Sequence, residues 1–247
     1  MEIFPLSEGC FTIDQTKKFI PFDKEKDDLQ KRPFGSLLVE IQPFVVVTSR
    51  DIILLDGGLG FSAASGKLQL YQNLISIGID PSTVTKVLLS HLHKDHSGGI
   101  AIVEKNSALR TPSFPHAIYY VNKQELELGN TIVSPSYIRE NFEWMNTAKN
   151  VVQIEGEGVI DEYISYKMTG AHSPFHQVFW IEENNHKIFF GADEAPQLQQ
   201  MKSKFVAKYD YDGKKAMEYR KDWWQCGEEG HWTFLFYHDI KTPVKVF

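Results

Sequence analysis

The sequence predicts an α+β fold in which two mixed β-sheets stack face to face and helices cover both outer faces. Two observations lead to this prediction. Short runs of β-branched and apolar residues, bounded by turn residues, recur along the chain and are typical of strands. Amphipathic segments at helical spacing flank these runs. Strands and helices of this kind bury their apolar faces best in a sheet-on-sheet core with helices outside it.

The first half of the chain is expected to hold strands, one helix and then a short buried strand. The helix carries Leu68, Tyr71, Leu74 and Ile75 at helical spacing, and it stops at Gly78, where a left-handed cap fits. The expected strands are residues 37–41, 44–48, 52–55 and 87–90, and the expected helix is 68–77.

The second half continues in the same style without repeating the sequence. Two of its strands are expected to form a hairpin across Glu183-Asn184-Asn185-His186, because asparagine tolerates the backbone of tight turns. The expected strands are residues 117–121, 151–154, 163–168, 177–182, 187–190 and 232–237, and the expected helices are 135–147 and 213–226.

Composition limits the classes of protein to consider. The chain has 247 residues, 42% hydrophobic and 23% charged, so a single domain over residues 1–247 is expected. The net charge of −6 does not fit a nucleic-acid partner. Neither a secretion signal nor a membrane span is visible, which predicts a cytoplasmic protein with no membrane partner. Cys10 and Cys226 lie outside any CxxC spacing, so reduced thiols are expected.

The most informative segment runs from His91 to His96 and follows the apolar run 87–89. It places three imidazoles and one carboxylate within six residues, a cluster that chance or unrelated surface histidines explain poorly. His91, His93 and Asp95 share one side of an extended segment, whereas His96 needs a turn. The segment therefore predicts ligands for two metal ions.

Two metal ions need more ligands than this segment offers. Three further candidates each follow an expected apolar strand, so they are expected to converge on one sheet edge. These candidates are His172, Asp193 and His238. Imidazole and carboxylate ligands suit zinc, iron, manganese or cobalt. Two divalent ions are expected, with zinc as the first choice.

From about Gly35 to the C-terminus, the sequence resembles the metallo-β-lactamase superfamily. The residues that carry the resemblance are Leu55-Asp56-Gly57-Gly58, the HxHxDHxGG pattern from His91 to Gly99, His172 in a glycine-containing turn, Asp193 and His238, all in the order of the family. Within the superfamily, the spacing and the strand entry at residues 114–117 are most similar to N-acyl homoserine lactone lactonases and methyl parathion hydrolase-like enzymes.

The resemblance implies an αβ/βα four-layer sandwich with the metals at one edge of the stacked sheets. Residues 1–35 would be an N-terminal extension that helps to line the active site, and the protein would be a homodimer. The ligand set carried over from the family assigns His91, His93 and His172 to the first metal, Asp95, His96 and His238 to the second, and Asp193 to both.

The function that follows is a dinuclear metal-dependent hydrolase. A hydroxide bridging the metals would attack a small ester, lactone or phosphotriester, with Asp95 and Asp193 as catalytic residues. A di-iron redox or oxygen-handling protein of the same fold, and a metal-stabilised binding protein without turnover, are the alternatives. Lactonases of this branch usually carry Tyr where this chain has Pro196, and Gly at the positions of Ala171 and Phe175. The substrate is therefore left open.

The remaining candidates receive supporting roles. The resemblance implies that Asp56 orients the metal loop through hydrogen bonds. It also implies that His176 is a structural hydrogen-bond partner in the second turn. The histidines expected at the surface or in loops are His116, His186 and His231, and the aromatic residues considered for a substrate pocket are Phe19, Phe22 and Phe61.

Overall fold

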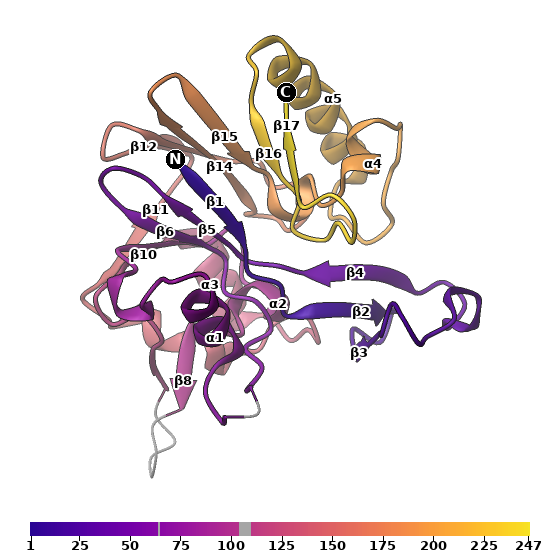
Figure 1. Cartoon of the computed structure of the whole chain (residues 1–247), viewed down its shortest axis with the longest axis horizontal. Helices are drawn as coiled ribbons and strands as arrows, with labels where there is room; N and C mark the ends of the chain where they lie inside the picture. The colour runs from indigo at the N-terminus through magenta and orange to yellow at the C-terminus, as the bar shows by residue number, and fades with distance from the viewer. Residues whose placement is uncertain (64, 104–109) are drawn as a thin grey trace.

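Two stacked six-stranded sheets form the centre of the computed structural model, which describes residues 1–63, 65–103 and 110–247 (Figure 1). The first sheet has the order β1 (Glu2–Pro5), β5 (Phe44–Val47), β6 (Ile52–Leu55), β7 (Lys86–Leu88), β10 (Ile118–Asn122) and β11 (Val151–Ile154). The second has the order β12 (Glu157–Ile160), β13 (Ile164–Met168), β14 (Gln177–Glu183), β15 (His186–Phe190), β16 (Thr233–Leu235) and β17 (Val244–Val246).

Both sheets are mixed, as the sequence predicts. In the first sheet, β6, β7, β10 and β11 pair in parallel, and β1, β5 and β6 pair antiparallel. In the second, β15 and β16 are the parallel pair among antiparallel neighbours. The β14–β15 hairpin also forms as expected, since Asn184 and Asn185 adopt positive φ angles of 51° and 62°.

The strands are apolar on both faces because each sheet is covered on both sides. Leu55 of β6 points into the core between the sheets, whereas Leu54 points to the outer helices. In the second sheet, Phe190 of β15 faces the shared core and Phe189 faces the outer layer. Successive side chains on a strand point to opposite faces, so this alternation builds the expected four-layer α+β sandwich.

Helices cover the two outer faces (Figure 1). Those packed on the first sheet are α1 (Gln69–Ser76) and α3 (Lys123–Thr131), and those packed on the second are α4 (Leu198–Met201) and α5 (Gly213–Glu229). A single helical turn, α2 (Lys94–Ser97), follows β7, and the 3₁₀ turns are η1 (Leu29–Lys31), η2 (Pro81–Thr83), η3 (Arg139–Asn141), η4 (Glu143–Asn146) and η5 (Ala192–Glu194).

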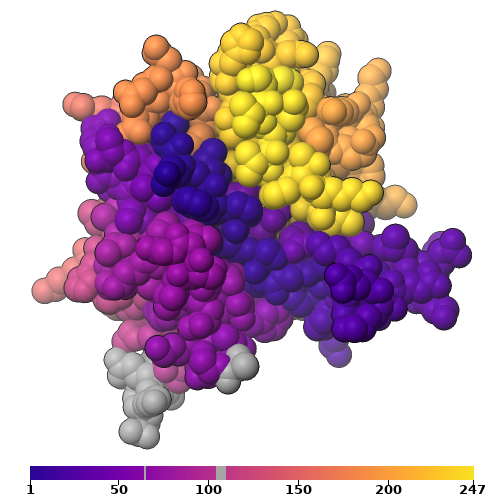
Figure 2. All heavy atoms as spheres, viewed as in Figure 1, coloured from indigo at the N-terminus to yellow at the C-terminus, as the bar shows by residue number. Residues whose placement is uncertain are grey.

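A three-stranded arm projects from the side of the sandwich, next to the C-terminal segment (Figures 1 and 2). Its strands are β3 (Phe19–Pro21), β2 (Gly9–Ile13) and β4 (Leu37–Ile41), in that order. A small hairpin of β8 (Ala101–Val103) and β9 (Arg110–Pro112) lies elsewhere on the surface. The sequence predicts β4 but not the other two strands of the arm.

The prediction of a helix over residues 135–147 is wrong. The segment forms two 3₁₀ turns instead, η3 and η4, whose backbone hydrogen bonds span three residues. Short turns of this kind allow both Phe142 and Met145 to reach the core beside the first sheet. The helix that the sequence analysis missed is α3, which begins where the Asn122 side chain accepts hydrogen bonds from the backbone N–H groups of Gln124 and Glu125.

Other boundaries differ by a few residues. The last helix continues to Glu229 rather than ending at 226, and the strand expected at 232–237 is limited to Thr233–Leu235. Cys10 is buried and Cys226 is exposed, and the structure shows both as free cysteines. Within the described part of the chain, no helix has both the length and the apolar character needed to cross a membrane.

Adjacent residues of α1 provide a test of the layer assignment. Leu74 is fully buried, whereas Ile75 is 53% exposed. We expect Leu74→Ala to lower the free energy of unfolding by about 2–5 kcal/mol, because it leaves a cavity under the helix. Ile75→Ala is the matched control, with an expected loss below about 1 kcal/mol. Urea unfolding measures both, and equal losses would contradict the orientation of α1.

Candidate metal centre

The histidine-rich segment occupies the loop that leaves β7 and the α2 turn that follows. His91 precedes the turn, and α2 then rotates the chain so that Asp95 and His96 face the sheet edge. The loop packs tightly on the turn after β6, where a Cβ on Gly98 would overlap the Leu59 carbonyl group. Glycine is therefore required at position 98 for the two loops to approach this closely.

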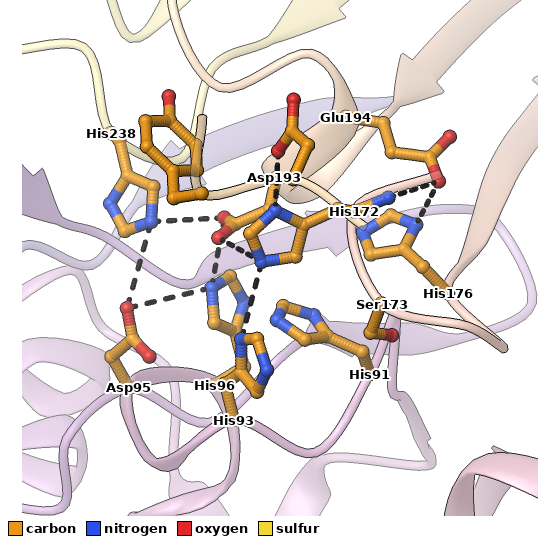
Figure 3. Close-up of polar contacts among 12 residues, drawn as sticks. His91, His93, Asp95, His96, His172, Ser173, His176, Asp193, Glu194 and His238 are labelled. Atoms are coloured by element: carbon orange, nitrogen blue, oxygen red, sulfur yellow. Dashed lines mark hydrogen bonds and ion pairs between the residues drawn. The ribbon is translucent and has the colours of Figure 1, made fainter. Parts of the chain in front are cut away.

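The structure brings all seven sequence-predicted ligands together at one edge of the two sheets (Figure 3). They form two groups, and the possible ligand atoms within each group lie within 4.8 Å of one another. The first group contains His91, His93, His172 and Asp193, and the second contains Asp95, His96 and His238. Both groups are largely buried, and each could hold a metal ion.

The Asp193 carboxylate faces both groups. Its Oδ2 atom lies 3.1 Å from Nε2 of His172 in the first group. Its Oδ1 atom lies 3.0 Å from Nε2 of His96 and 2.9 Å from Nε2 of His238 in the second. Asp193 is therefore the one described carboxylate that contacts imidazoles of both groups (Figure 3).

Hydrogen bonds to the opposite ring nitrogen orient the imidazoles. Nδ1 of His172 lies 2.9 Å from the Asp210 carboxylate, and Nδ1 of His238 lies 2.8 Å from the Glu40 carbonyl oxygen. Because a carbonyl or an ionised carboxylate only accepts, each Nδ1 carries the proton. The Nε2 lone pairs are then directed at the centre of the site, as metal ligation requires.

Asp56 orients the rings of the first loop in the same way. Its carboxylate accepts hydrogen bonds from the Ser90 N–H (2.8 Å) and the Ser90 hydroxyl (2.7 Å), and it lies 2.7 Å from Nδ1 of His96. The Ser90 oxygen then accepts from Nδ1 of His91 at 3.0 Å. These contacts confirm that Asp56 orients the loop through hydrogen bonds.

Buried atoms without partners show that the site fits a cation. Among the described residues, Nε2 of His91, Nε2 of His96 and Oδ1 of Asp193 are buried without a hydrogen-bond partner. Leaving such atoms unpaired is costly. Since Nδ1 of His96 already donates to Asp56, the close approach of its Nε2 to Asp193 needs a proton or a cation between them. The nitrogen and oxygen donors match borderline divalent metals.

Charge is unevenly distributed over the two groups. Burial lowers the pKa of His91 and His93 well below the usual range, and neighbouring imidazoles lower it further. Burial also opposes protonation of His96, but the carboxylates of Asp193 and Asp95 outweigh it and raise the His96 pKa well above the usual range. His91 and His93 thus present neutral nitrogen donors, whereas His172 of the same group has a raised pKa because Asp193 and Asp210 outweigh its burial.

Three acidic side chains that the sequence analysis did not assign form hydrogen bonds with the candidate ligands or with the loops that carry them. Asp210 holds His172, and Glu194 accepts a hydrogen bond from the backbone N–H of His172 at 3.1 Å. Glu125 accepts from the backbone N–H of Leu92 at 3.1 Å. Asp210 lies 38 residues from the ring it holds, and Glu125 lies 33 residues from Leu92. No spacing in the sequence indicates these contacts.

The other histidines stay outside both groups. His176 is buried with its ring centre 4.9 Å from that of His91, and its Nδ1 lies 3.4 Å from the Glu194 carboxylate. The exposed histidines are His116, His186 and His231, as expected.

A cavity of about 970 Å³ opens above the two groups, between the arm and residues 196–209. Phe19 of the arm lines it, as expected for a pocket residue. The other two aromatic candidates do not: Phe22 is buried, and Phe61 packs on Phe11 with ring centres 5.5 Å apart. Tyr209 lines the cavity from the opposite side, with its ring centre 6.1 Å from that of His172.

Two lysines line this cavity, Lys17 of the arm and Lys94 of α2. Partial burial lowers the pKa of Lys94; the Asp95 carboxylate opposes this shift, and the positive charge of Lys17 adds to it. Within the described residues, neither lysine belongs to an ion pair.

A family model described as the metallo-beta-lactamase superfamily matches residues 40–238, which include all seven candidate ligands. The chain belongs to the metallo-beta-lactamase superfamily. Solved structures share its fold. A probable metal-dependent hydrolase from Staphylococcus aureus superposes with a TM-score of 0.78 at 18% identity, covering 99% of this chain and 91% of that one. AidC, a dizinc quorum-quenching lactonase, gives 0.70 at 18% identity, covering 99% and 89%.

Curated members of the metallo-beta-lactamase superfamily match part of the chain. N-acyl homoserine lactonase AttM of Agrobacterium fabrum is 29% identical over 123 residues, 45% of this chain and 41% of the relative. The protein of the same name from Azorhizobium caulinodans is 31% identical over 117 residues, 43% of this chain and 39% of the relative. The matched region thus spans less than half the length of these relatives.

A buried carboxyl beneath the metal loops gives a pH-dependent prediction. Glu8 accepts a hydrogen bond from the Leu59 N–H at 2.5 Å, and burial raises its pKa from 4.5 to about 7. The folded protein thus binds this proton more tightly than the unfolded chain, so wild-type stability falls as the pH rises from about 4.5 to about 7. Glu8→Gln removes this loss, and its stability relative to wild type should rise by about 3 kcal/mol across that range.

Urea unfolding between pH 4.5 and 8 measures the Glu8 effect, with exposed Glu2→Gln as the control. Parallel stability curves for wild type and Glu8→Gln would contradict it.

Proposed function

We propose that this protein is a two-metal hydrolase that cleaves a small ester or lactone, with phosphotriesters as a further substrate class. The observation that carries the proposal is the position of Asp193, whose two carboxylate oxygens face two separate groups of buried imidazoles. A carboxylate in this position is suited to bridge two cations, and paired cations favour hydrolytic displacement.

The proposed ligands are those that the geometry groups together. Asp193 would bridge, and the first ion would be held by His91, His93 and His172, the second by Asp95, His96 and His238. Zinc is our first choice because these nitrogen and oxygen donors suit it, with manganese, iron and cobalt next.

When bound, two divalent cations supply an ionised water near neutral pH and a Lewis acid for the substrate oxygen. The protein's own residues position the reactants around this centre. Asp193 holds the two groups in register, and Asp95 lies 3.6 Å from Nε2 of His238 on the far side of the second group. Both carboxylates lie where a proton released during hydrolysis has an acceptor.

Relatives support the choice of substrate class. The AttM proteins are named N-acyl homoserine lactonases. One structure of the same fold, at 20% identity and a TM-score of 0.67, holds the product N-hexanoyl-L-homoserine at its catalytic metal centre. A lactone or acyclic ester of similar size fits the 970 Å³ cavity above the site.

We propose that Tyr209 supplies the phenol that lactonases of this branch usually carry at the position of Pro196. Both residues line the cavity, but Tyr209 comes from a later segment of the chain. The Gln200 amide donates a hydrogen bond to its hydroxyl oxygen at 3.3 Å, so the phenol proton remains free to donate. Burial raises the Tyr209 pKa to about 12, so the group keeps this proton at neutral pH. We assign it to hydrogen bonding with the substrate carbonyl.

Ligand variants test the metal assignment. His93→Ala and Asp193→Asn are expected to lower the metal content below two ions per chain and to reduce ester hydrolysis by about a hundredfold or more, because each removes a donor atom. Metal analysis and a panel of lactones, aryl esters and phosphotriesters on zinc- and manganese-loaded protein measure both effects.

The control for the ligand variants is His116→Ala, which removes an exposed histidine outside both groups. A fully active, metal-loaded His93→Ala protein would refute the assignment. Bound iron with visible absorption and no hydrolysis of the panel would instead support a di-iron redox protein.

Tyr209→Phe isolates the phenol. We expect kcat/KM for the preferred ester to fall about tenfold while metal content is unchanged, because a single hydrogen bond to the substrate is lost. Tyr211→Phe is the matched control, since Tyr211 is 71% exposed and lies two residues away. Unchanged kcat/KM in the Tyr209 variant would exclude this role.

A further inference from the structure

The cavity above the candidate metal centre is more cationic than the protein around it. Apart from the proposed ligands, its charged lining residues are four basic side chains and one acidic one: Lys17, Arg32, Lys94, Lys208 and Asp14. The whole chain, in contrast, carries a net charge of −6. A basic lining in an acidic protein concentrates anions at the mouth of the site.

Little in the described structure neutralises this lining. None of the four basic residues belongs to an ion pair among the described residues. The Asp14 carboxylate accepts two hydrogen bonds through Oδ1 within its own turn, from the N–H of Thr16 at 2.8 Å and from its hydroxyl at 2.6 Å, and it forms no ion pair with the four basic residues among the described residues. The basic groups are therefore available to a ligand.

Lys17 and Lys94 reach the cavity from two different elements. Lys17 lies in the turn between β2 and β3 with a positive φ of 57°, a backbone conformation that non-glycine residues rarely adopt. Lys94 begins α2 directly after His93, and its Nζ lies 5.7 Å from the centre of the Phe19 ring. Both lysines line the cavity beside the candidate metal centre, and their positive charges would attract an anion bound between them.

Part of the remaining cavity wall is apolar, and much of that part belongs to the arm. Phe19, Leu29 and Leu37 line it, and the last two are 57% and 40% exposed. Exposed apolar side chains beside unpaired cations suit a ligand that has both an apolar chain and an anionic group.

We propose that the substrate carries an anionic oxyacid group, a carboxylate or a phosphate, which binds between Lys17 and Lys94. Its apolar part lies along the arm, and its ester or lactone carbonyl reaches the candidate metal centre. The proposal rests on the proposed function for the bond that is cleaved, where water adds across the ester to give an acid and an alcohol. The binding of the anion does not depend on turnover.

Binding without turnover tests the anion site. Hexanoate offers one carboxylate, which can contact the metals, whereas adipate offers a second to the lysines. On zinc-loaded protein, we expect calorimetry to give adipate a Kd about tenfold lower than that of hexanoate at low salt. This advantage should shrink at high salt. Matched pairs of other chain lengths, and 6-phosphohexanoate, determine the spacing and the preferred oxyanion.

Charge-removing variants connect the preference to the lysines. Lys17→Met and Lys94→Met keep most of the apolar stem and remove the charge, and each should reduce the adipate advantage several-fold. In the double variant adipate and hexanoate should bind alike. Lys221→Met, on the exposed face of α5, should keep the wild-type preference.

Kinetics separate this proposal from the proposed function. Mono-4-nitrophenyl adipate should show a kcat/KM about tenfold above that of 4-nitrophenyl hexanoate, mainly through KM. Hydrolysis of both esters with no preference, and equal Kd values at every chain length, would overturn the anion site and leave the hydrolase intact. Preferential binding of adipate by a two-metal protein that hydrolyses no ester would support the anion site and refute the hydrolase.

Discussion

The Asp56 carboxylate is completely buried at the end of β6 and connects that strand to the loop after β7. It reaches this position because its own backbone adopts a positive φ of 58°. From there it accepts hydrogen bonds from the Ser90 N–H, the Ser90 hydroxyl and Nδ1 of His96. The Ser90 oxygen in turn accepts a hydrogen bond from Nδ1 of His91. One anion thus sets the orientation and proton position of two rings, and without it several buried donors would lose their partner.

The candidate ligands that follow strands of the second sheet are also oriented by hydrogen bonds to Nδ1, but from other acceptors. Asp210 orients His172, and a main-chain carbonyl, that of Glu40, orients His238. These two rings and the Asp56-supported loop meet only because the sheets share one apolar core, in which Leu88 of the first sheet and Phe190 of the second are fully buried. The core therefore fixes the distance across which Asp193 contacts both groups.

Sequence patterns predicted the parts of the molecule that depend on neighbouring residues. These parts can be recognised from short stretches of sequence. They are the His91–His96 spacing, the apolar strands, the Asn184-Asn185 turn, and polar residues such as His238 that directly follow a strand. Asp210 and Tyr209 could not be found in this way, since only tertiary packing brings residues 209–210 to His172. The 135–147 segment was misjudged because its apolar spacing fits a helix equally well, and packing beside the first sheet decided between α and 3₁₀ turns.

The arm connects the cavity to the candidate metal centre. Val39 of β4 lines the cavity, while the next residue, Glu40, supplies the carbonyl that orients His238. A change that moves β4 to reshape the cavity therefore also moves a support of the second group. A change in the turn that carries Lys17 need not move His238. This turn follows β2, which pairs with β4, and it makes no direct hydrogen bond to a candidate ligand among the described residues. In this architecture the sheet edges hold the candidate ligands in place, and the end of the arm is the part of the cavity wall that can vary most freely.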